Sequence, residues 1–333
     1  MAPPTADPFD WRDGDRLVLF GRGRAGEAAE RAPRPFTLMT TARARAATPE
    51  FEQAADAVVE VPPGRVDEIS EELIGAVGHD QVVAVGGGRV IDVAKAVVAA
   101  RGAGEVAAVP TTLSAAEMTG FHRQVPGASG FVRPTLIAAD PALSASQPDA
   151  ELAASTLNSL GHALEATVTI RANLVATLVA HEGARRLLAG WRELDGGHTD
   201  AHRDSLALGA VLSGYAIDSA GLGLHHVLSQ TLARFAGVPH ATANAVMLTH
   251  TLRALDRRQP RAIAAVGEAL GEDPISVAAE LAARAGATRL RELGVGQELL
   301  GECAERAAER PQLEATPPPA DRSEVLALYE TAW

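Results

Sequence analysis

The chain has 333 residues, 47% of them hydrophobic and 22% charged, which is typical of a globular protein with two domains of ordinary size. Its net charge of −12 argues against a nonspecific nucleic-acid surface, and its one cysteine, Cys303, excludes an intramolecular disulfide. No apolar run reaches the roughly 18 residues of a membrane span, so we expect a cytoplasmic protein without nucleic-acid or membrane partners.

The first 148 residues alternate short β-branched runs with segments of helical period. Strands are predicted at 16–21, 36–41, 54–62, 80–88, 105–112 and 134–141, with helices at 49–57, 66–77 and 90–102. Strand–helix alternation with short links predicts a parallel sheet covered on both faces.

From residue 149 onward the helical period continues and strand patterns disappear. Helices are predicted at 149–170, 173–191, 202–220, 225–237, 241–255, 260–271, 274–287 and 296–310. The sequence therefore predicts two domains, an α/β domain at 1–148 and an all-helical domain at 149–333.

A glycine-rich turn interrupts the α/β pattern in the stretch VVAVGGGRVIDVAKA. Gly86, Gly87 and Gly88 stand between a buried strand and a helix start, where backbone N–H groups can face a pyrophosphate. The spacing differs from G-x-G-x-x-G, and similar turns occur without ligands. Arg89 either adds a charge to a phosphate or points to solvent.

Two threonines follow the next predicted strand in VPTTLSAAEMTG. Thr111 and Thr112 at the carboxyl end of a parallel strand would point into a ligand crevice. The alternative is an ordinary helix N-terminus capped by Ser114.

Histidines are the candidate catalytic residues of the second half. In STLNSLGHALEA, Asn158 and His162 lie four residues apart and share one helix face. His226, on a later helix, is followed after a Val-Pro turn by His240, and a helix–turn–helix can bring the two together. Each histidine alone is more often a structural residue, but together they indicate a polar site.

Five motifs in this order resemble one family: GGGRVIDVAKA, PTTLSAAEMT, TLIAADPAL, STLNSLGHALEA and GLGLHHVL…GVPHATANAVML. The chain resembles the iron-containing (group III) alcohol dehydrogenase superfamily, and within it most resembles the maleylacetate reductases. The resemblance implies an N-terminal Rossmann-like domain, a C-terminal helical domain, an active site between them and a homodimer.

The resemblance also assigns residues to a nicotinamide cofactor, NAD(H) or NADP(H). The residues implied at the pyrophosphate and the nicotinamide nucleotide are Gly86, Gly87, Gly88, Arg89, Asp92, Thr111, Thr112 and Thr119. At the end of the strand at 36–41 no acid is present to select NAD, and Arg43 or Arg45 could reach a 2′-phosphate or lie in solvent.

In metal-dependent relatives an Asp and three His hold Fe²⁺ or Zn²⁺. The corresponding positions here are Asn158, His162, His226 and His240. Asn158 removes the anionic ligand and so weakens any metal site, and maleylacetate reductases resemble this chain in carrying Asn there. We therefore expect catalysis without a metal, although Zn or Fe on these four residues remains possible.

The predicted activity is NAD(P)H-dependent reduction of a small keto acid or carbonyl compound, or of a maleylacetate-like C=C substrate. His162, His226 and His240 would donate protons, at least one of them charged near neutral pH, and Asn158 would orient His162 or bind substrate. The expected substrate contacts are His122, Arg123, Arg133 and Gln230.

Three other readings stay open. One is a metal-dependent alcohol dehydrogenase with Asn158 as a weak ligand, and another is a lyase of the sugar-phosphate cyclase type. The third is a non-catalytic scaffold. It is suggested by three departures from the family, because relatives carry Ser at the positions of Arg89 and Ala116 and His at the position of Gln230.

Overall fold

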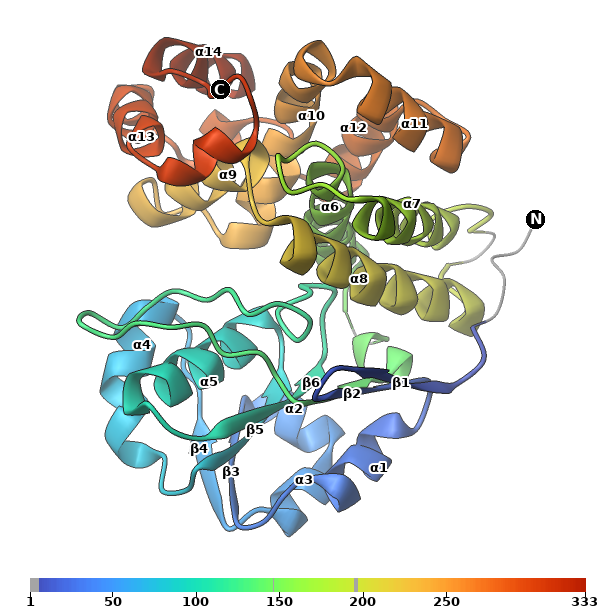
Figure 1. The fold of residues 1–333 in the computed structure, drawn as a ribbon, viewed down its shortest axis with the longest axis vertical. Coiled ribbons are helices and arrows are strands. Elements are labelled where there is room, and N and C mark those ends of the chain that lie inside the picture. Colours follow the sequence, from blue (N-terminus) through green and yellow to red (C-terminus); the bar gives the residue numbers. More distant parts are fainter. Residues whose placement is uncertain (1–5, 146, 195–196) are drawn as a thin grey trace. The chain divides into compact units, whose positions relative to one another are not determined.

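The computed structural model describes residues 6–145, 147–194 and 197–333 and divides into two compact units (Figure 1). The first unit comprises the described residues of Met1–Ser146 together with Ala189–Gly214; the second comprises Gln147–Leu188 and Tyr215–Trp333. Among the described residues no single helix has the length and apolar composition of a membrane span, and α8 and α9 meet that test only as a bent pair.

The first unit is built on a seven-stranded sheet of order β1-β2-β7-β6-β5-β3-β4. The strands are β1 Phe9–Asp13, β2 Arg16–Phe20, β3 Phe36–Thr40, β4 Ala57–Glu60, β5 Gln81–Gly86, β6 Glu105–Pro110 and β7 Leu136–Ala139. All neighbouring strands are parallel except β1, which pairs antiparallel with β2. A tight turn joins this pair, in which Gly14 adopts a left-handed φ of 64°.

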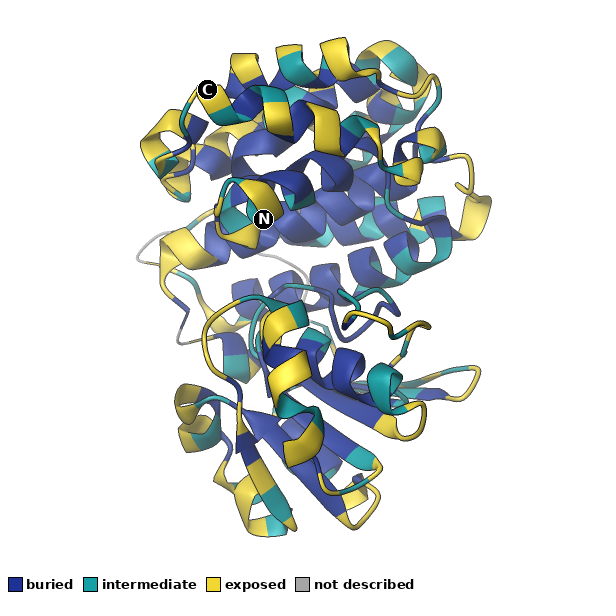
Figure 2. Ribbon diagram, turned by 90° about the vertical axis from the view of Figure 1, so that its left-hand side faces the viewer, coloured by how far each residue is buried: buried dark blue, intermediate teal, exposed yellow. Residues whose placement is uncertain are grey.

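Helices cover both faces of the sheet, as the alternating apolar residues of its strands require. Val82 and Ala84 pack in a cluster with α4 (Val66–Leu73) and α5 (Gly88–Arg101). The next residues along β5, Val83 and Val85, pack in a second cluster with α1, α2 and α3. These three helices are α1 Arg24–Arg31, α2 Ala42–Ala47 and α3 Pro49–Ala54. Figure 2 shows the inner strands of the sheet buried, whereas the edge strands β1 and β4 are partly exposed.

The segment Ala189–Gly214 belongs to the first unit, although it is separated in sequence from the rest of that unit. The Arg203 guanidinium donates to the Ser144 carbonyl at 2.9 Å, and a Cβ on Gly214 would lie 2.7 Å from the Cβ of Met118. The compact units therefore differ here from the predicted domains 1–148 and 149–333. Helix α8 (Asp200–Ala220) begins in the first unit and ends in the second.

The second unit is helical throughout the part that the structure describes. Besides the end of α8 it contains α6 Asp149–Ala166, α7 Leu174–Ala189, α9 Leu224–Phe235, α10 His240–Arg258, α11 Pro260–Leu270, α12 Pro274–Arg284, α13 Glu298–Ala308 and α14 Arg322–Ala332. Helix α10 contacts α6, α9, α12 and α14 and is the centre of this unit's core. An α/β unit followed by helices confirms the predicted fold class.

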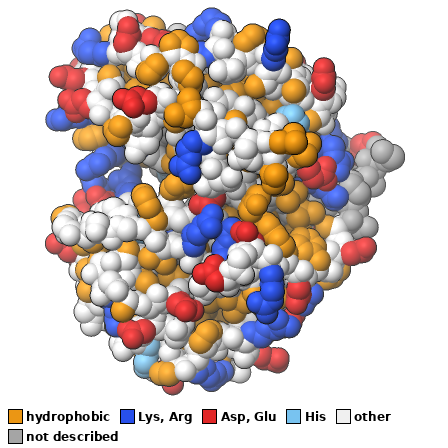
Figure 3. Space-filling view, in the orientation of Figure 1, with side chains coloured by type: hydrophobic (Ala, Val, Ile, Leu, Met, Phe, Trp, Pro, Cys, Tyr) orange, Lys and Arg blue, Asp and Glu red, His pale blue; other side chains and the backbone are white. Residues whose placement is uncertain are grey.

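Four elements were not predicted from the sequence. Strand β1 contains charged residues on its exposed side, and α1 and α2 are short, alanine- and arginine-rich segments without a large apolar side chain. The fourth, α14, follows a proline-rich stretch that reads as a turn. On the face drawn in Figure 3, arginine and acidic side chains are interspersed, which does not suggest a nucleic-acid surface there.

Candidate functional site

The order of the strands creates a topological switch point within the first unit. The chain passes from β3 outward to β4 and then returns to place β5 on the other side of β3. The helices that follow β3 and β5 therefore lie on opposite faces, and their connections diverge at the carboxyl ends of the two strands. In open α/β sheets this switch point is where nucleotides bind.

The glycine turn lies at this switch point. Gly86 ends β5, and Gly87 is the N-cap of α5 and makes no side-chain cap hydrogen bond. A Cβ on Gly87 would lie 3.1 Å from Thr112, and one on Gly88 would lie 2.8 Å from Ser114. The turn is thus lined by two hydroxyl-bearing residues and opens onto the first N–H groups of a 14-residue helix, a donor set that fits a pyrophosphate.

The other predicted cofactor residues differ in their surroundings. Arg89 is exposed in the first turn of α5, whereas the Asp92 carboxylate lies 2.8 Å from the Lys95 ammonium. Thr111 is half-buried after β6, and Thr119 is 6% exposed. The structure thus brings Gly86, Gly87, Gly88 and Thr112 together directly.

Lys95, the one lysine of the chain, is fully buried. Its ammonium donates to the carbonyl oxygens of Ala116, Thr119 and Phe121 at 2.9, 3.0 and 2.6 Å. These residues belong to the segment between β6 and β7, which contains no helix or strand. Lys95 therefore fixes the part of that segment that carries Thr119.

Glu117 lies in the same segment and is 1% exposed. Burial raises the pKa of its carboxyl to about 7, against the opposing effects of a backbone hydrogen bond and of Lys95. It borders a small cavity of about 20 Å³ together with Thr112, Asp140 and Ser144. Two residues earlier, Ala115 adopts a left-handed φ of 60°.

The predicted substrate residues of the first unit lie further along this segment. His122 Nδ1 lies 3.0 Å from the Arg123 carbonyl oxygen, and the Arg123 guanidinium lies 3.6 Å from Asp67. Arg133 is exposed. Their assignment to substrate stays a prediction.

Two of the predicted catalytic histidines meet in the second unit. Helix α6 carries Asn158 and His162, which are 4% and 7% exposed, and α9 carries the buried His226. The rings of His162 and His226 are stacked, with centroids 4.5 Å apart and planes 6° from parallel. Gly161 makes room for the neighbouring His225, whose Nε2 would lie 2.7 Å from a Cβ there.

Glu165 is a site residue that the sequence reading missed. Its fully buried carboxylate lies 2.6 Å from His226 Nδ1 and accepts the His225 backbone N–H at 2.7 Å. A carboxylate only accepts, so this contact places the His226 proton on Nδ1 and leaves Nε2 as the acceptor. The signal was present, because Glu165 stands three residues after His162 on one helix face in an apolar stretch.

The ring nitrogens His162 Nδ1 and His226 Nε2 are buried and have no hydrogen-bond partner among the residues that the structure describes. Such atoms are rare in folded proteins and mark places where a ligand or water is bound. Burial lowers the pKa of both side chains, and the neighbouring histidines contribute. The lowered pKa favours the neutral imidazole at both positions near pH 7, and the expectation that at least one of the three histidines is charged stays a prediction.

His240, the third predicted histidine, is the first residue of α10 and is exposed. Its Nε2 lies 3.2 Å from the Asn244 amide nitrogen, and the Asn244 oxygen accepts from Ser229 at 2.7 Å. Within the described residues no three His, Cys, Asp or Glu side chains converge as a metal site would require. With Asn158 in place of a carboxylate, this donor set does not fit a tightly held divalent metal.

Gln230, predicted to contact substrate, lies one turn beyond His226 on α9. Its amide oxygen accepts from Arg310 Nη2 at 2.7 Å. Arg310, which no sequence pattern singled out, lies between α13 and the 3₁₀ turn Pro311–Ala315.

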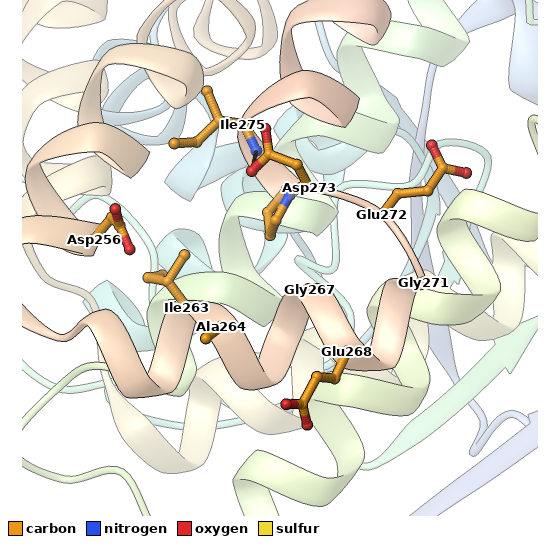
Figure 4. Close-up of a pocket in the computed structure, with 10 residues that line it drawn as sticks. Asp256, Ile263, Ala264, Gly267, Glu268, Gly271, Glu272, Asp273 and Ile275 are labelled. Carbon is orange, nitrogen blue, oxygen red and sulfur yellow. Dashed lines mark hydrogen bonds between the residues drawn. The ribbon is translucent and has the colours of Figure 1, made fainter.

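A wide surface hollow of about 520 Å³ lies elsewhere in the second unit, between α11 and the start of α12 (Figure 4). Four of the residues that line it are acids, Asp256, Glu268, Glu272 and Asp273. Asp273 caps α12 by accepting from the Ser276 N–H at 3.0 Å. The hollow contains no histidine and lies apart from the chemistry described above.

Comparison with known proteins shows the family of the chain. Residues 152–333 match the model of the Fe-containing alcohol dehydrogenase family, C-terminal, and residues 39–123 match that of iron-containing alcohol dehydrogenase. The chain belongs to the iron-containing alcohol dehydrogenase family. The resemblance predicted from the five motifs is thereby confirmed.

Within the iron-containing alcohol dehydrogenase family, the chain is 31% identical to maleylacetate reductase of Burkholderia cepacia over 68% of its own length and 66% of the reductase. It is 32% identical to 1,3-propanediol dehydrogenase of Citrobacter freundii over 50% of the chain and 44% of that relative. The chain thus spans slightly less than two thirds of the first of these curated relatives.

A solved structure extends the likeness to the whole chain. The crystal structure of maleylacetate reductase from Agrobacterium tumefaciens superposes with a TM-score of 0.82 at 26% identity, covering 98% of this chain and 99% of that one. Its two-part architecture confirms the predicted fold. The relatives are named as reductases and dehydrogenases, which are oxidoreductases, the enzyme class predicted from the sequence.

Proposed function

We propose that the chain is an NAD(P)H-dependent reductase of small carbonyl compounds, keto acids foremost, that works without a bound metal. The observation that carries the proposal is the stacked pair His162 and His226, in which His162 Nδ1 and His226 Nε2 are buried without a hydrogen-bond partner among the described residues. The nucleotide crevice at the β3–β5 switch point supports it, as do relatives named maleylacetate reductase.

Gly86, Gly87 and Gly88 would hold the pyrophosphate of a nicotinamide cofactor, which when bound would supply a hydride, so that a ketone, NAD(P)H and a proton would give a secondary alcohol and NAD(P)⁺. The chain must bind the carbonyl oxygen as negative charge develops on it and must provide the proton. No other group in the proposal changes its oxidation state.

The two histidines have different roles, and only His162 acts on the carbonyl oxygen. Glu165 keeps the proton of His226 on Nδ1 and so leaves Nε2 as an acceptor. The neutral His162 ring carries one N–H, and we assign it as the donor to the carbonyl oxygen, with Asn158 setting its orientation from one turn earlier. His240, at the start of α10, exchanges the proton with solvent.

Replacing Glu165 tests this division. Glu165→Gln removes the acceptor that selects the His226 tautomer, and we expect kcat to fall by about 10² or more with a smaller change in KM. Glu280→Gln, on exposed α12, is the matched control. If Glu165→Gln changes kcat and KM no more than Glu280→Gln does, the assignment is contradicted.

Independence from metal rests on the donor set. Asn158 supplies a neutral oxygen where the metal-binding relatives carry a carboxylate, and no three acidic or histidine ligands converge among the described residues. We expect chelated protein to keep its activity, and we expect Asn158→Asp to gain Zn²⁺ affinity. Stoichiometric metal in wild-type protein, with activity lost on chelation, would instead favour the metal-dependent alcohol dehydrogenase.

The first experiment is a titration of purified protein with NADH and NADPH, followed by tryptophan fluorescence, with metal content measured on the same sample. Binding of either cofactor, with oxo-acid-dependent oxidation of the nicotinamide, is the expected result. Binding of neither would leave the non-catalytic scaffold as the better reading.

Cofactor choice is predicted to tolerate NADPH. Thr40 is the last residue of β3, and its hydroxyl donates to the Val85 carbonyl at 2.9 Å. Thr41 caps the N-terminus of α2. No acid stands at this strand end to bind a ribose 2′-OH, and Arg43 is close enough in sequence to meet a 2′-phosphate. A homodimeric, cytoplasmic enzyme remains part of the proposal.

A further inference from the structure

The small cavity of the first unit lies at the carboxyl ends of two neighbouring strands. Pro110 ends β6 and Asp140 directly follows β7, and both border this cavity of about 20 Å³. The other residues at its wall with oxygen-bearing side chains are Thr112, Glu117 and Ser144. A cavity of this volume holds one water molecule or one ion of similar size.

The Glu117 carboxyl is the group at this wall that lacks a partner. The residue is 1% exposed, and its Oε2 atom has no hydrogen-bond partner among the described residues. Lys95 acts on this carboxyl only through its charge, because the contacts of its ammonium are three carbonyl oxygens and the Asp92 carboxylate. Buried polar atoms without a partner are rare and mark places where a water or an ion binds.

Two further side chains of the wall have their hydrogen bonds already assigned. The Asp140 carboxylate accepts the Ala142 N–H at 3.0 Å through one oxygen and the Ala25 N–H at 3.3 Å through the other. The Ser144 hydroxyl donates its proton to the Pro141 carbonyl at 3.0 Å, so that only lone pairs remain on its oxygen. The wall therefore offers acceptor oxygens, which are the ligands that hard cations prefer.

The charge at the cavity favours a monovalent cation over a divalent one. When ionised, Glu117 carries one negative charge, whereas the side chains of Thr112 and Ser144 are neutral. The charge of Asp140 is stabilised by the two backbone N–H groups that it accepts. Among the described residues no three His, Cys, Asp or Glu side chains converge, as a tightly bound divalent or transition metal would require.

We propose that this cavity binds one monovalent cation of the size of potassium, held by the Glu117 carboxylate and the hydroxyl oxygens of Thr112 and Ser144. The ion takes the place of the proton that neutralises the buried Glu117. Thr112 also packs against the glycine turn, where a Cβ on Gly87 would lie 3.1 Å from its Cγ2 atom. The site therefore adjoins the predicted cofactor turn, but the inference does not depend on the proposed reductase function.

The cation and a proton compete for the same carboxyl group. Burial raises the pKa of Glu117 to about 7, and Asp92 adds to this effect while a backbone hydrogen bond and Lys95 oppose it. The other charged residues beside the cavity are Asp140, after β7, and Arg203, on α8. We therefore expect the cation to bind at pH 8 and not at pH 5, and to reduce the loss of stability that ionisation of Glu117 causes at alkaline pH.

Thermal unfolding of the full chain in two salts of equal ionic strength tests the site. Potassium chloride supplies the proposed ion, whereas tetramethylammonium chloride supplies a cation too large for the cavity. At pH 8 we expect the Tm to be about 2–4 °C higher in about 100 mM potassium, with a saturable dependence on its concentration. At pH 5 the two salts should give the same Tm. Equal Tm values in both salts at pH 8 would overturn the inference and leave a water molecule as the occupant.

Variants show whether the effect arises at this cavity. Glu117→Gln keeps the shape of the side chain without its charge and should abolish the potassium effect at pH 8, and Ser144→Ala should reduce it. Glu30→Gln, which replaces an exposed acid of α1, should leave the effect unchanged. A full potassium effect in Glu117→Gln would place the ion elsewhere and overturn the inference.

A measurement on wild-type protein covers the case in which Glu117→Gln does not fold. Crystals soaked in rubidium chloride at pH 8 should show an anomalous scattering peak beside Glu117 Oε2, because rubidium replaces potassium at its sites. The peak should be absent from crystals soaked at pH 5. Absence of the peak at pH 8 would contradict the proposal.

Discussion

At the scale of single residues, Lys95 explains why one lysine is kept in a chain whose other 29 basic residues are arginine. Three carbonyl oxygens and the Asp92 carboxylate converge on one point in a fully buried space. A tetrahedral ammonium can serve convergent acceptors, whereas a planar guanidinium cannot occupy the same point. Composition drew attention to this residue, but only the structure shows its partners.

Replacing Lys95 should therefore be costly even when the charge is kept. We expect both Lys95→Met and Lys95→Arg to lower the free energy of unfolding by about 3 kcal/mol, since buried carbonyls lose their donor. Chemical denaturation measures the change, with exposed Arg89→Lys on the same helix as control. A loss below about 1 kcal/mol in Lys95→Met would show that the segment at 116–121 does not depend on the ammonium.

Glu117 predicts a pH dependence of stability in the first unit. Its folded pKa, about 7, lies above the ordinary value of 4.5, so the folded state binds the proton more tightly. Its contribution is complete below about pH 4.5 and is lost as the pH rises through about 7, which amounts to about 3 kcal/mol.

Glu117→Gln stays neutral at every pH and should lack this loss. The free energy of unfolding of the variant relative to wild type should rise by about 3 kcal/mol between about pH 5 and pH 8. Urea titrations at both values measure it, and exposed Glu30→Gln is the control. A difference that does not change with pH would mean that Glu117 ionises freely in the folded protein.

At the scale of elements, the glycine turn and the segment after β6 form one packed unit. Gly87 and Gly88 face Thr112 and Ser114 so closely that a Cβ at either position would meet a side chain. The turn therefore needs glycine because Thr112 and Ser114 leave no space for a Cβ, as well as for the approach of a ligand. Local sequence identified the turn, but the reason for its third glycine lies twenty-six residues away, at Ser114.

A double-mutant cycle tests this packing. Gly88→Ala places a Cβ 2.8 Å from the Ser114 Cβ, and we expect it to destabilise the protein by about 1–3 kcal/mol and to weaken NAD(P)H binding. Adding Ser114→Gly should recover at least about 1 kcal/mol of the loss. Additive effects in the cycle, with no recovery, would contradict direct contact between the two positions.

At the scale of the molecule, the compact units do not follow the change in sequence pattern. Most of residues 189–214 fall within predicted helices, yet this segment belongs to the first unit. Arg203 donates to the Ser144 carbonyl, Gly214 packs against Met118, and Arg22 pairs with Asp204 at 2.8 Å. A fragment of residues 1–148 should therefore unfold without a cooperative transition, because it lacks the segment that covers Ala115 and Met118. Thermal unfolding by circular dichroism, with the full chain as reference, measures this, and a sharp two-state transition in the fragment would contradict it.

The sequence by itself determined the succession of strands and helices, the glycine turn and the polar face of α6, because these depend on periods and on residues close together in the chain. It also carried the five ordered motifs that revealed the family. Only the tertiary structure decided which distant groups meet: Glu165 with His226, Lys95 with the carbonyls at 116–121, and Arg310 with Gln230. Such contacts join positions tens of residues apart, and burial, which no local pattern reports, is what makes each of them chemically important.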